Sequence, residues 1–356
     1  MQEERGPPSY MSIAPSSVQE GALRMAPFLG VPSLLAGFGL DPAAIIAEAG
    51  MGIGLFDEPE HDVPFRTLGR LLALGAERSG CPHFGHLIGE QVGLDALGLI
   101  GQLADNAPNV GAALHELILY LHLHDRGAVP ALWICEDRAV VAYVVYEAGI
   151  PGIEQIYDTA VAITFNVIKT LCGAGFEPLE VRFSRPAPAD VEPYRRLYHT
   201  QLSFGAEHSA VVFAAHWLQH PLDGADALLH VQLLQTIELL DAQRTDDLVA
   251  RLRRTLRRIL IQSAAPGDTS LAHIARLFKL HRRTLNRRLR ALGTSFKVLI
   301  EEARYDVARQ LLRDTSLPIA DIAASLDYAD AAAFTRAFKR WSGVSPGAWR
   351  NSPPLR

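Results

Sequence analysis

The chain has 356 residues, of which 49% are hydrophobic, 21% charged and 8% aromatic, a composition typical of a globular protein with two or three domains. No apolar stretch reaches the roughly 18 residues that a membrane-spanning helix needs, which excludes an integral membrane protein. The net charge of −5 conceals an asymmetry. Residues 245–356 hold 21 Lys and Arg against ten Asp and Glu, a net charge of +11, whereas residues 1–244 hold 13 and 29, a net charge of −16. This asymmetry predicts that the basic C-terminal part binds a polyanion and that the acidic N-terminal part does not.

The N-terminal segment MQEERGPPSY has no apolar run, so we expect no signal peptide and a disordered lead-in over residues 1–20. The three cysteines, Cys81, Cys135 and Cys172, show no C-x-x-C spacing. This pattern argues against a disulfide framework and against a zinc site, and it fits a reducing compartment. We therefore expect a cytoplasmic protein.

Residues 21–225 predict an α+β domain. Helical periodicity marks the helices, and runs of β-branched and aromatic residues mark the strands. The predicted elements are helices at 65–79, 109–121 and 153–172, a β-hairpin at 129–135 and 139–146, and strands near 177–183 and 210–214 that flank a short helix. A linker helix is predicted within 226–245, and a basic helix follows at 246–262.

After a break at 264–268, the chain is predicted to be entirely helical and contains an internal repeat. A shift of 48 residues aligns Ile274 with Ile322 and Ala275 with Ala323. Each copy has the pattern of a short helix, a tight turn and a second helix, with a small alanine where the two helices cross, which is typical of a helix-turn-helix unit. One amphipathic helix, over 295–313, would join the two units. The predicted all-α domain spans 246–350, and 351–356 form a tail.

The second helix of the first unit is strongly basic. Leu285 and Leu289 point into its small core, which leaves arginine and asparagine side chains on the outer faces. Arginine can form hydrogen bonds to both O6 and N7 of guanine at once, and asparagine can do the same with N6 and N7 of adenine. Both side chains can also bind phosphate. The predicted DNA-contacting residues are His281, Arg282, Arg283, Asn286, Arg287 and Arg290.

The second unit has a less basic outer helix, over residues 330–341. Phe334, Ala337, Phe338 and Trp341 form its predicted buried stripe. Small residues near its start favour contact with thymine methyl groups over hydrogen-bonded recognition, and the later basic residues suit backbone contacts. The predicted DNA-contacting residues are Asp330, Ala331, Ala332, Thr335, Arg336, Lys339 and Arg340.

Residues 246–350 resemble the DNA-binding domain of the AraC/XylS family. The resemblance lies in the run 282–289, the run Leu317-Pro318-Ile319-Ala320-Asp321-Ile322-Ala323, and above all the segment 333–346. It implies two recognition helices placed in successive major grooves of double-stranded DNA and, for most members, activation of transcription with RNA polymerase as a partner.

Two turns depart from the family pattern, which has Gly-x-Ser before each recognition helix. Here the positions are Lys279-Leu280-His281 and Asp327-Tyr328-Ala329. Glycine suits a left-handed turn, aspartate tolerates it and lysine does so less well. Alanine cannot cap a helix, a loss of about 1 kcal/mol that Asp330 would partly recover.

The N-terminal half resembles the arabinose-binding-type domain of one branch of the same family. The segments that carry this resemblance are 191–194, 202–213 and 218–222. The resemblance implies sensing of an effector, not necessarily a sugar, or formation of a homodimer.

We predict a pocket for a small apolar effector between the hairpin and the helix 153–172. Its candidate wall is aromatic: Trp133, Tyr143, Tyr146, Tyr157 and Phe165. These rings could instead be core residues, and the helix 153–172 could instead be a dimer face. A DNA-binding protein whose N-terminal domain only oligomerises remains an alternative.

An enzyme with a DNA-targeting tail is the third alternative, but the catalytic motifs that we considered are absent. Gly52-Ile53-Gly54 lacks the third glycine of a dinucleotide fingerprint, and Cys81-Pro82-His83 resembles a nucleophilic cysteine site only loosely. His122-Leu123-His124 could ligate a metal, but alternate histidines are more often surface groups. We therefore expect no catalysis, no cofactor and no metal.

Overall fold

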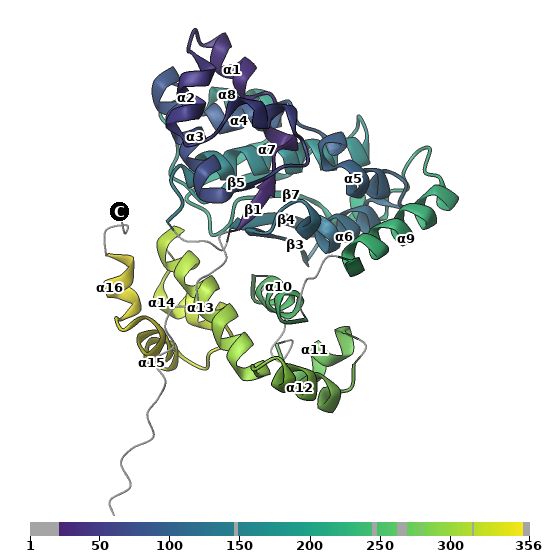
Figure 1. The fold of residues 1–356 in the computed structure, drawn as a ribbon, viewed down its shortest axis with the longest axis vertical. Helices are drawn as coiled ribbons and strands as arrows, with labels where there is room; N and C mark the ends of the chain where they lie inside the picture. The colour runs from purple at the N-terminus through teal and green to yellow at the C-terminus, as the bar shows by residue number, and fades with distance from the viewer. Residues whose placement is uncertain are drawn as a thin grey trace, which may run out of the picture.

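The computed structural model describes residues 21–145, 149–243, 248–261, 269–278, 280–314 and 317–351 (Figure 1). The helices are α1 (Val31–Gly37), α2 (Pro42–Glu48), α3 (Phe65–Ser79), α4 (Phe84–Glu90), α5 (Gly98–Asp105), α6 (Val110–Tyr120), α7 (Ile153–Cys172), α8 (Glu192–Tyr198), α9 (Ala227–Gln243), α10 (Leu248–Ile261), α11 (Leu271–Leu277), α12 (Arg282–Ala291), α13 (Phe296–Asp314), α14 (Ile319–Ser325), α15 (Ala331–Ser342) and α16 (Pro346–Arg350). The strands are β1 (Ala22–Arg24), β2 (Asp62–Pro64), β3 (Ala128–Cys135), β4 (Arg138–Val145), β5 (Glu180–Phe183), β6 (Gln201–Phe204) and β7 (Ala210–Ala214).

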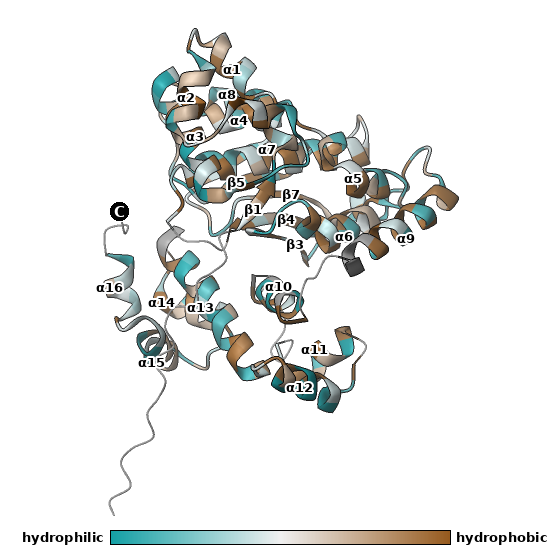
Figure 2. Ribbon diagram, viewed as in Figure 1, coloured by the Kyte–Doolittle hydropathy of each residue, from teal (hydrophilic) through white to brown (hydrophobic). Residues whose placement is uncertain are grey.

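A five-stranded sheet forms the centre of the N-terminal half, in the order β3-β4-β7-β5-β6. Neighbouring strands are antiparallel except for β5 and β6, which are parallel. The strands β1 and β2 form a separate antiparallel pair. The central strands are largely hydrophobic (Figure 2), as expected where both faces of a sheet are covered.

The helix α7 covers one face of this sheet. Its buried Phe165 and Ile168 share one hydrophobic core with Val141 of β4 and Phe213 of β7. On the other side of α7, α4 packs unusually closely because Gly85 has no side chain. A Cβ atom at Gly85 would lie 2.1 Å from the Gln155 carbonyl oxygen.

A buried ion pair fixes the segment after β5 to α7. Asp158 is fully buried on α7, and Arg185 donates to its two carboxylate oxygens from Nε at 3.0 Å and from Nη2 at 2.7 Å. The Tyr194 hydroxyl of α8 donates to the same carboxylate at 2.6 Å. Burial raises the pKa of Asp158 to about 6 although Arg185 opposes the shift.

The C-terminal half is built on the helix pair α10 and α13. Leu252 and Leu256 of α10 share a core with Leu299 of α13. Two ion pairs run along the same contact: Arg253 with Glu302 at 2.8 Å, and the buried Arg257 with Asp306, whose carboxylate accepts from the arginine Nε at 3.0 Å. The helix α13 runs between the pair α11–α12 and the pair α14–α15 (Figure 1), so it sets the two pairs apart.

The two halves meet at the second face of the sheet. Val129 and Ala131 of β3 and Val144 of β4 are buried in the same cluster as Leu252 and Leu256 of α10. Because strand residues alternate between faces, β3 and β4 contact α10 with one set of side chains and the interior of the N-terminal half with the other.

The predicted α+β half followed by a helical half is confirmed. The helix predicted at 153–172 is α7 to the residue, and β7 spans the predicted 210–214. The strand β6 was not predicted, since Gln201 and Ser203 interrupt its hydrophobic pattern. The lead-in 1–20 and the last five residues of the tail fall outside the described residues. No helix within the described ranges combines the length and the hydropathy that a membrane span requires.

Candidate nucleic-acid interface and ligand cavity

The helix α12 presents arginines on an otherwise well-anchored scaffold. His281 is its N-cap, with the ring Nδ1 accepting from the Arg283 backbone N–H at 3.3 Å. Leu285 and Leu289 are fully buried, which fixes the rotation of the helix. The arginines Arg282, Arg283, Arg287, Arg288 and Arg290 are exposed, and Asn286 is half-buried. Within the described part of the chain none of these arginines forms an ion pair, so their charge is available to phosphate and base edges.

The helix α15 has a different outer face. Its N-cap is Asp330, whose carboxylate accepts from the Ala333 N–H at 2.6 Å. Thr335 is half-buried and its hydroxyl donates to the Ala331 carbonyl at 2.7 Å, so this hydroxyl already bonds its own helix. Ala332, Arg336 and Lys339 are exposed, and Ala331 is half-buried. Arg340 is exposed too, but it lies 3.6 Å from Glu301 of α13 and covers the Trp341 ring. Fewer cations therefore extend from α15 than from α12.

The turn before α15 accommodates aspartate where the family has glycine. Asp327 adopts a left-handed conformation with φ at 63°. Its carboxylate accepts from the Thr269 hydroxyl at 3.1 Å and from Arg304 of α13 at 3.3 Å. The aspartate thus connects the start of the first unit to the second, a role that glycine could not have. Lys279, at the equivalent place in the first unit, lies outside the described residues.

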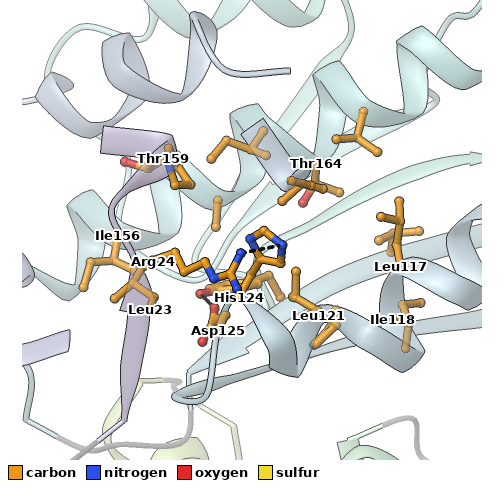
Figure 3. Close-up of a pocket in the computed structure, with 18 of the residues that line it drawn as sticks. Leu23, Arg24, Leu117, Ile118, Leu121, His124, Asp125, Ile156, Thr159 and Thr164 are labelled. Carbon is orange, nitrogen blue, oxygen red and sulfur yellow. Dashed lines mark hydrogen bonds between the residues drawn. The ribbon is translucent and has the colours of Figure 1, made fainter. Parts of the chain in front are cut away.

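A cavity of about 130 Å³ lies in the N-terminal half, between α7, α6 and the inner face of β3 and β4 (Figure 3). The helix α7 lines it with a stripe at helical spacing: Ile156, Thr159, Ala160, Ile163, Thr164 and Val167. From α6 come Leu114, Leu117 and Ile118, and from the sheet Pro130, Val141, Ala142 and Tyr143. The wall is mainly aliphatic.

One end of the cavity is polar, where Arg24, His124 and Asp125 lie close together (Figure 3). Tyr143 also lines the cavity and bonds to Asp125. Arg24 lies 3.5 Å from the His124 ring Nε2 and 2.5 Å from the exposed carboxylate of Glu60. Asp125 is buried, and its carboxylate accepts from the Gly127 and Ala128 N–H groups and from the Tyr143 hydroxyl. Burial raises the pKa of Asp125 to about 6, and these hydrogen bonds limit the rise.

Of the five predicted aromatic residues, the structure describes four, and only one of these four lines the cavity. Tyr143 lines it, whereas Tyr157 and Phe165 are buried in the core on other sides of α7. Trp133 lies on the opposite face of the sheet, beside α10, and Tyr146 falls outside the described residues. The location between hairpin and helix was predicted, but Arg24, His124 and the small residues of α7 were not selected. Two features of the sequence could have identified the lining residues: the alternation of side chains between the two faces of the hairpin, and the stripe of small residues along α7.

Other candidates have ordinary structural roles. His122 is half-buried and its ring lies 3.0 Å from the Leu119 carbonyl, while His124 faces Arg24, a cation that would repel a metal ion. No cluster of three potential metal-ligating side chains occurs among the described residues. Burial raises the pKa of the Cys81 thiol, which lowers its nucleophilicity.

The helix α9 is apolar on two faces. Leu233 and Ile237 are buried against the N-terminal half. On the opposite face Leu228, Val231 and Leu239 are exposed, with exposed fractions of 68%, 48% and 63%. An apolar stripe of this kind on a surface helix commonly marks a protein interface.

Comparison with known proteins places both halves. Residues 39–222 match the family described as the arabinose-binding domain of AraC transcription regulators, and residues 274–352 match a helix-turn-helix domain family. The chain is 26% identical over 323 residues to the ornithine utilization regulator of Pseudomonas aeruginosa, covering 90% of this chain and 94% of that protein. It is also 26% identical to the regulator VirS of Mycobacterium tuberculosis, covering 92% and 96%. The crystal structure of the transcriptional regulator CdpR from Pseudomonas aeruginosa is similar with a TM-score of 0.45 and 22% identity, covering 90% of this chain and 96% of CdpR.

Proposed function

The chain belongs to the AraC family of helix-turn-helix transcription regulators, and on that premise we propose how it recognises DNA. The helices α12 and α15 enter successive major grooves on one side of the duplex. Base recognition rests mainly on Arg282, Arg283, Asn286 and Arg287, with Arg290 and His281 near the backbone. The helix α15 contributes apolar contacts from Ala331, Ala332 and Thr335 and backbone contacts from Arg336, Lys339 and Arg340, and Asp330 caps it.

The observation that carries this proposal is the surface of exposed arginines on α12, which form no ion pair with any residue that the structure describes. Two buried leucines fix the orientation of this helix. The test begins with selection of bound duplexes from a random-sequence pool by the full-length protein. We expect a preferred sequence that the protein binds at least a hundredfold more tightly than a scrambled one, with affinity that falls steeply as salt rises. Equal binding to every duplex would refute sequence-specific recognition.

The N-terminal half, residues 21–225, is proposed to bind a small effector in the cavity beside Tyr143. The strands β3 and β4 support this role because they line the cavity on one face and contact α10 on the other. A ligand that moves these strands would therefore change the surface against which the DNA-binding half, residues 246–350, is packed. The proposed outcome is activation of transcription through contact with RNA polymerase. One relative, NphR of Rhodococcus, is named a transcriptional activator.

We propose further that the protein is a homodimer joined through the linker helix α9. The exposed Leu228, Val231 and Leu239 lie on one face of this helix, opposite the face that is already buried. Leu239→Glu should convert the dimer to a monomer in light scattering, whereas Leu179→Glu, a change at another exposed leucine, should not. A Leu239→Glu protein that remains dimeric would move the interface elsewhere.

A regulator of this kind acts on chromosomal DNA, so we propose a cytoplasmic location and no catalytic activity. Both points rest on the relatives, which are named as regulators.

A further inference from the structure

The cavity beside Tyr143 has two chemically distinct ends. The body is aliphatic, walled by leucine, isoleucine and valine side chains of α6 and α7. Its volume of about 130 Å³ is similar to that of an engineered apolar protein cavity of about 150 Å³ that binds benzene. An apolar group of about six carbon atoms therefore fits this body.

At the polar end Arg24 contacts His124 and forms an ion pair with an exposed carboxylate that another carboxylate could replace. Arg24 is largely buried, with its side chain 16% exposed, whereas the carboxylate that it contacts, Glu60, is 70% exposed. Ion pairs with such exposed carboxylates contribute little to stability, about 0–1 kcal/mol. A carboxylate that entered from the cavity could replace Glu60 at the guanidinium without a large penalty and would gain two parallel hydrogen bonds.

The carboxylate of Asp125, at the same end, already accepts hydrogen bonds from the protein itself. One oxygen of Asp125 accepts from the Gly127 N–H at 2.9 Å and the Ala128 N–H at 3.0 Å, and the other accepts from Tyr143. These bonds hold the turn that leads into β3. Asp125 therefore stabilises the protein's own backbone, and an amine entering the cavity would meet Arg24 as a like charge.

A sugar does not fit this lining. Each buried hydroxyl of a sugar requires a hydrogen-bonding partner, and an unsatisfied polar group costs about 1–3 kcal/mol. Beyond the polar end, the cavity offers only the threonines of α7, and the Thr159 hydroxyl already donates toward the carbonyl oxygens of Gly85 and Gln155.

We propose that this cavity binds an apolar monocarboxylate, a short aliphatic or aromatic acid, with its carboxylate on Arg24 and its apolar body between α6 and α7. This rests on the proposed effector role of the N-terminal half and names the ligand class for that site. The family description mentions arabinose, and the cavity chemistry of this chain points to a different class.

The test uses the full-length protein and five probes of similar size, whose binding is followed by calorimetry and thermal unfolding. Hexanoate and benzoate should bind saturably and raise the unfolding temperature, hexanol should bind at least tenfold more weakly, and hexylamine should not bind. L-arabinose serves as the sugar probe and should not bind. Equal binding of hexanol and hexanoate, or tighter binding of hexylamine or arabinose, would overturn the ligand class while leaving an effector role in place.

Two variants place the ligand. Arg24→Met keeps most of the side-chain volume and should weaken hexanoate at least tenfold with little effect on hexanol, whereas Arg66→Met, which removes an exposed arginine of α3 outside the cavity, should leave both unchanged. Ala160→Leu should fill the apolar body and weaken all binding probes. The unfolding temperature of each unliganded variant shows that it is folded. Arg24→Met with unchanged hexanoate affinity refutes the assigned contact.

The same samples are tested for DNA binding without any probe. If no probe binds but the selected DNA is still recognised, the ligand proposal fails and the DNA-binding proposal stands. Loss of specific DNA binding in the unmodified protein would instead refute the proposed function itself.

Discussion

The two helix-turn-helix units have the same topology but different surfaces. The helix α12 extends five exposed arginines, whereas α15 begins with small residues and its Arg340 is held by Glu301. In the first unit the N-cap is weak, because the His281 ring accepts from the Arg283 N–H at 3.3 Å. In the second unit the Asp330 carboxylate accepts from the Ala333 N–H at 2.6 Å, a much shorter cap bond. Charge for binding DNA is concentrated in one unit, and local order at the turn is concentrated in the other.

From this difference we expect the two repeats to contribute unequally to DNA recognition. Electrostatic contacts with phosphate supply affinity for any sequence, and bidentate arginine or asparagine contacts supply discrimination. Since α12 carries both residue types and α15 carries mainly small residues, we expect the first unit to dominate specificity. The second unit then acts mainly by fixing the register of the protein on the duplex.

The largest expected effect comes from breaking the frame that both units share. Arg257 and Asp306 form a buried pair between α10 and α13, with side chains 10% and 9% exposed. Arg257→Met should leave the Asp306 carboxylate buried with reduced pairing and cost about 3–5 kcal/mol of unfolding free energy. Chemical denaturation should show this loss, and DNA binding by both units should fall together.

Arg253→Met is the matched control. Its partner Glu302 and the arginine itself are more exposed, at 22% and 36%, so we expect a loss of no more than about 1 kcal/mol. Similar losses in the two variants would mean that burial of the Arg257 pair is not what stabilises the frame.

The second-largest expected effect, a loss of DNA affinity, directly compares the contributions of α12 and α15. Arg283→Ala or Arg287→Ala should weaken binding to the selected site by about 1–3 kcal/mol and relax the preference at particular base positions. Lys339→Ala, on α15, should cause a smaller loss that is the same on every sequence and should reduce the salt dependence by about one ion. Anisotropy titrations against single-base variants of the site measure both. A base-specific loss at Lys339 and a uniform loss at Arg283 would reverse the assignment of the two units.

The contrast between the two units was largely visible in the sequence. The 48-residue repeat, the buried Leu285 and Leu289, and the buried Phe334 and Phe338 follow from helical periodicity alone, which is the strongest local signal in a sequence. Asp330 as a compensating cap was also predicted, and its bond to Ala333 confirms it. The bridge from Asp327 to Thr269 was not predictable, since 58 residues separate the two and only the packing of the units brings them together.

The cavity beside Tyr143 was less predictable for a physical reason. A cavity is the space that side chains leave, so its wall includes small residues such as Ala160 and Thr164 whose sequence pattern is that of any buried helix. Large aromatic residues fill space, and Phe165 and Tyr157 do so in the core. Arg24 lies in a three-residue strand that has no periodicity to detect, and it reaches His124 across 100 positions of sequence.

A smaller effect tests the unequal caps. Asp330→Ala should destabilise α15 and cost about 1 kcal/mol of unfolding free energy, because the Ala333 N–H loses its acceptor. Asp330→Asn should restore most of this loss, since asparagine caps equally well. His281→Ala should cost less, given the longer bond at α12. Thermal unfolding without DNA measures all three, and a larger loss at His281 than at Asp330 would contradict the comparison of caps.

The smallest effect concerns the aspartate that replaces the family's turn glycine. Asp327→Gly relieves the left-handed conformation at φ 63°, a gain of up to about 1 kcal/mol, but removes the bonds to Thr269 and Arg304. Asp327→Asn keeps tolerance for this conformation and removes only the charge, so it isolates the ion pair with Arg304. Because the Asp327 side chain is 41% exposed, that pair contributes at most about 1 kcal/mol and should weaken with salt. Urea denaturation at low and high salt separates the ion pair from the backbone strain. The loss of unfolding free energy in Asp327→Asn should shrink at high salt. The unfolding free energy of Asp327→Gly should rise relative to that of the unmodified protein at high salt. A loss in Asp327→Asn that is independent of salt would contradict the assignment of that loss to the ion pair with Arg304.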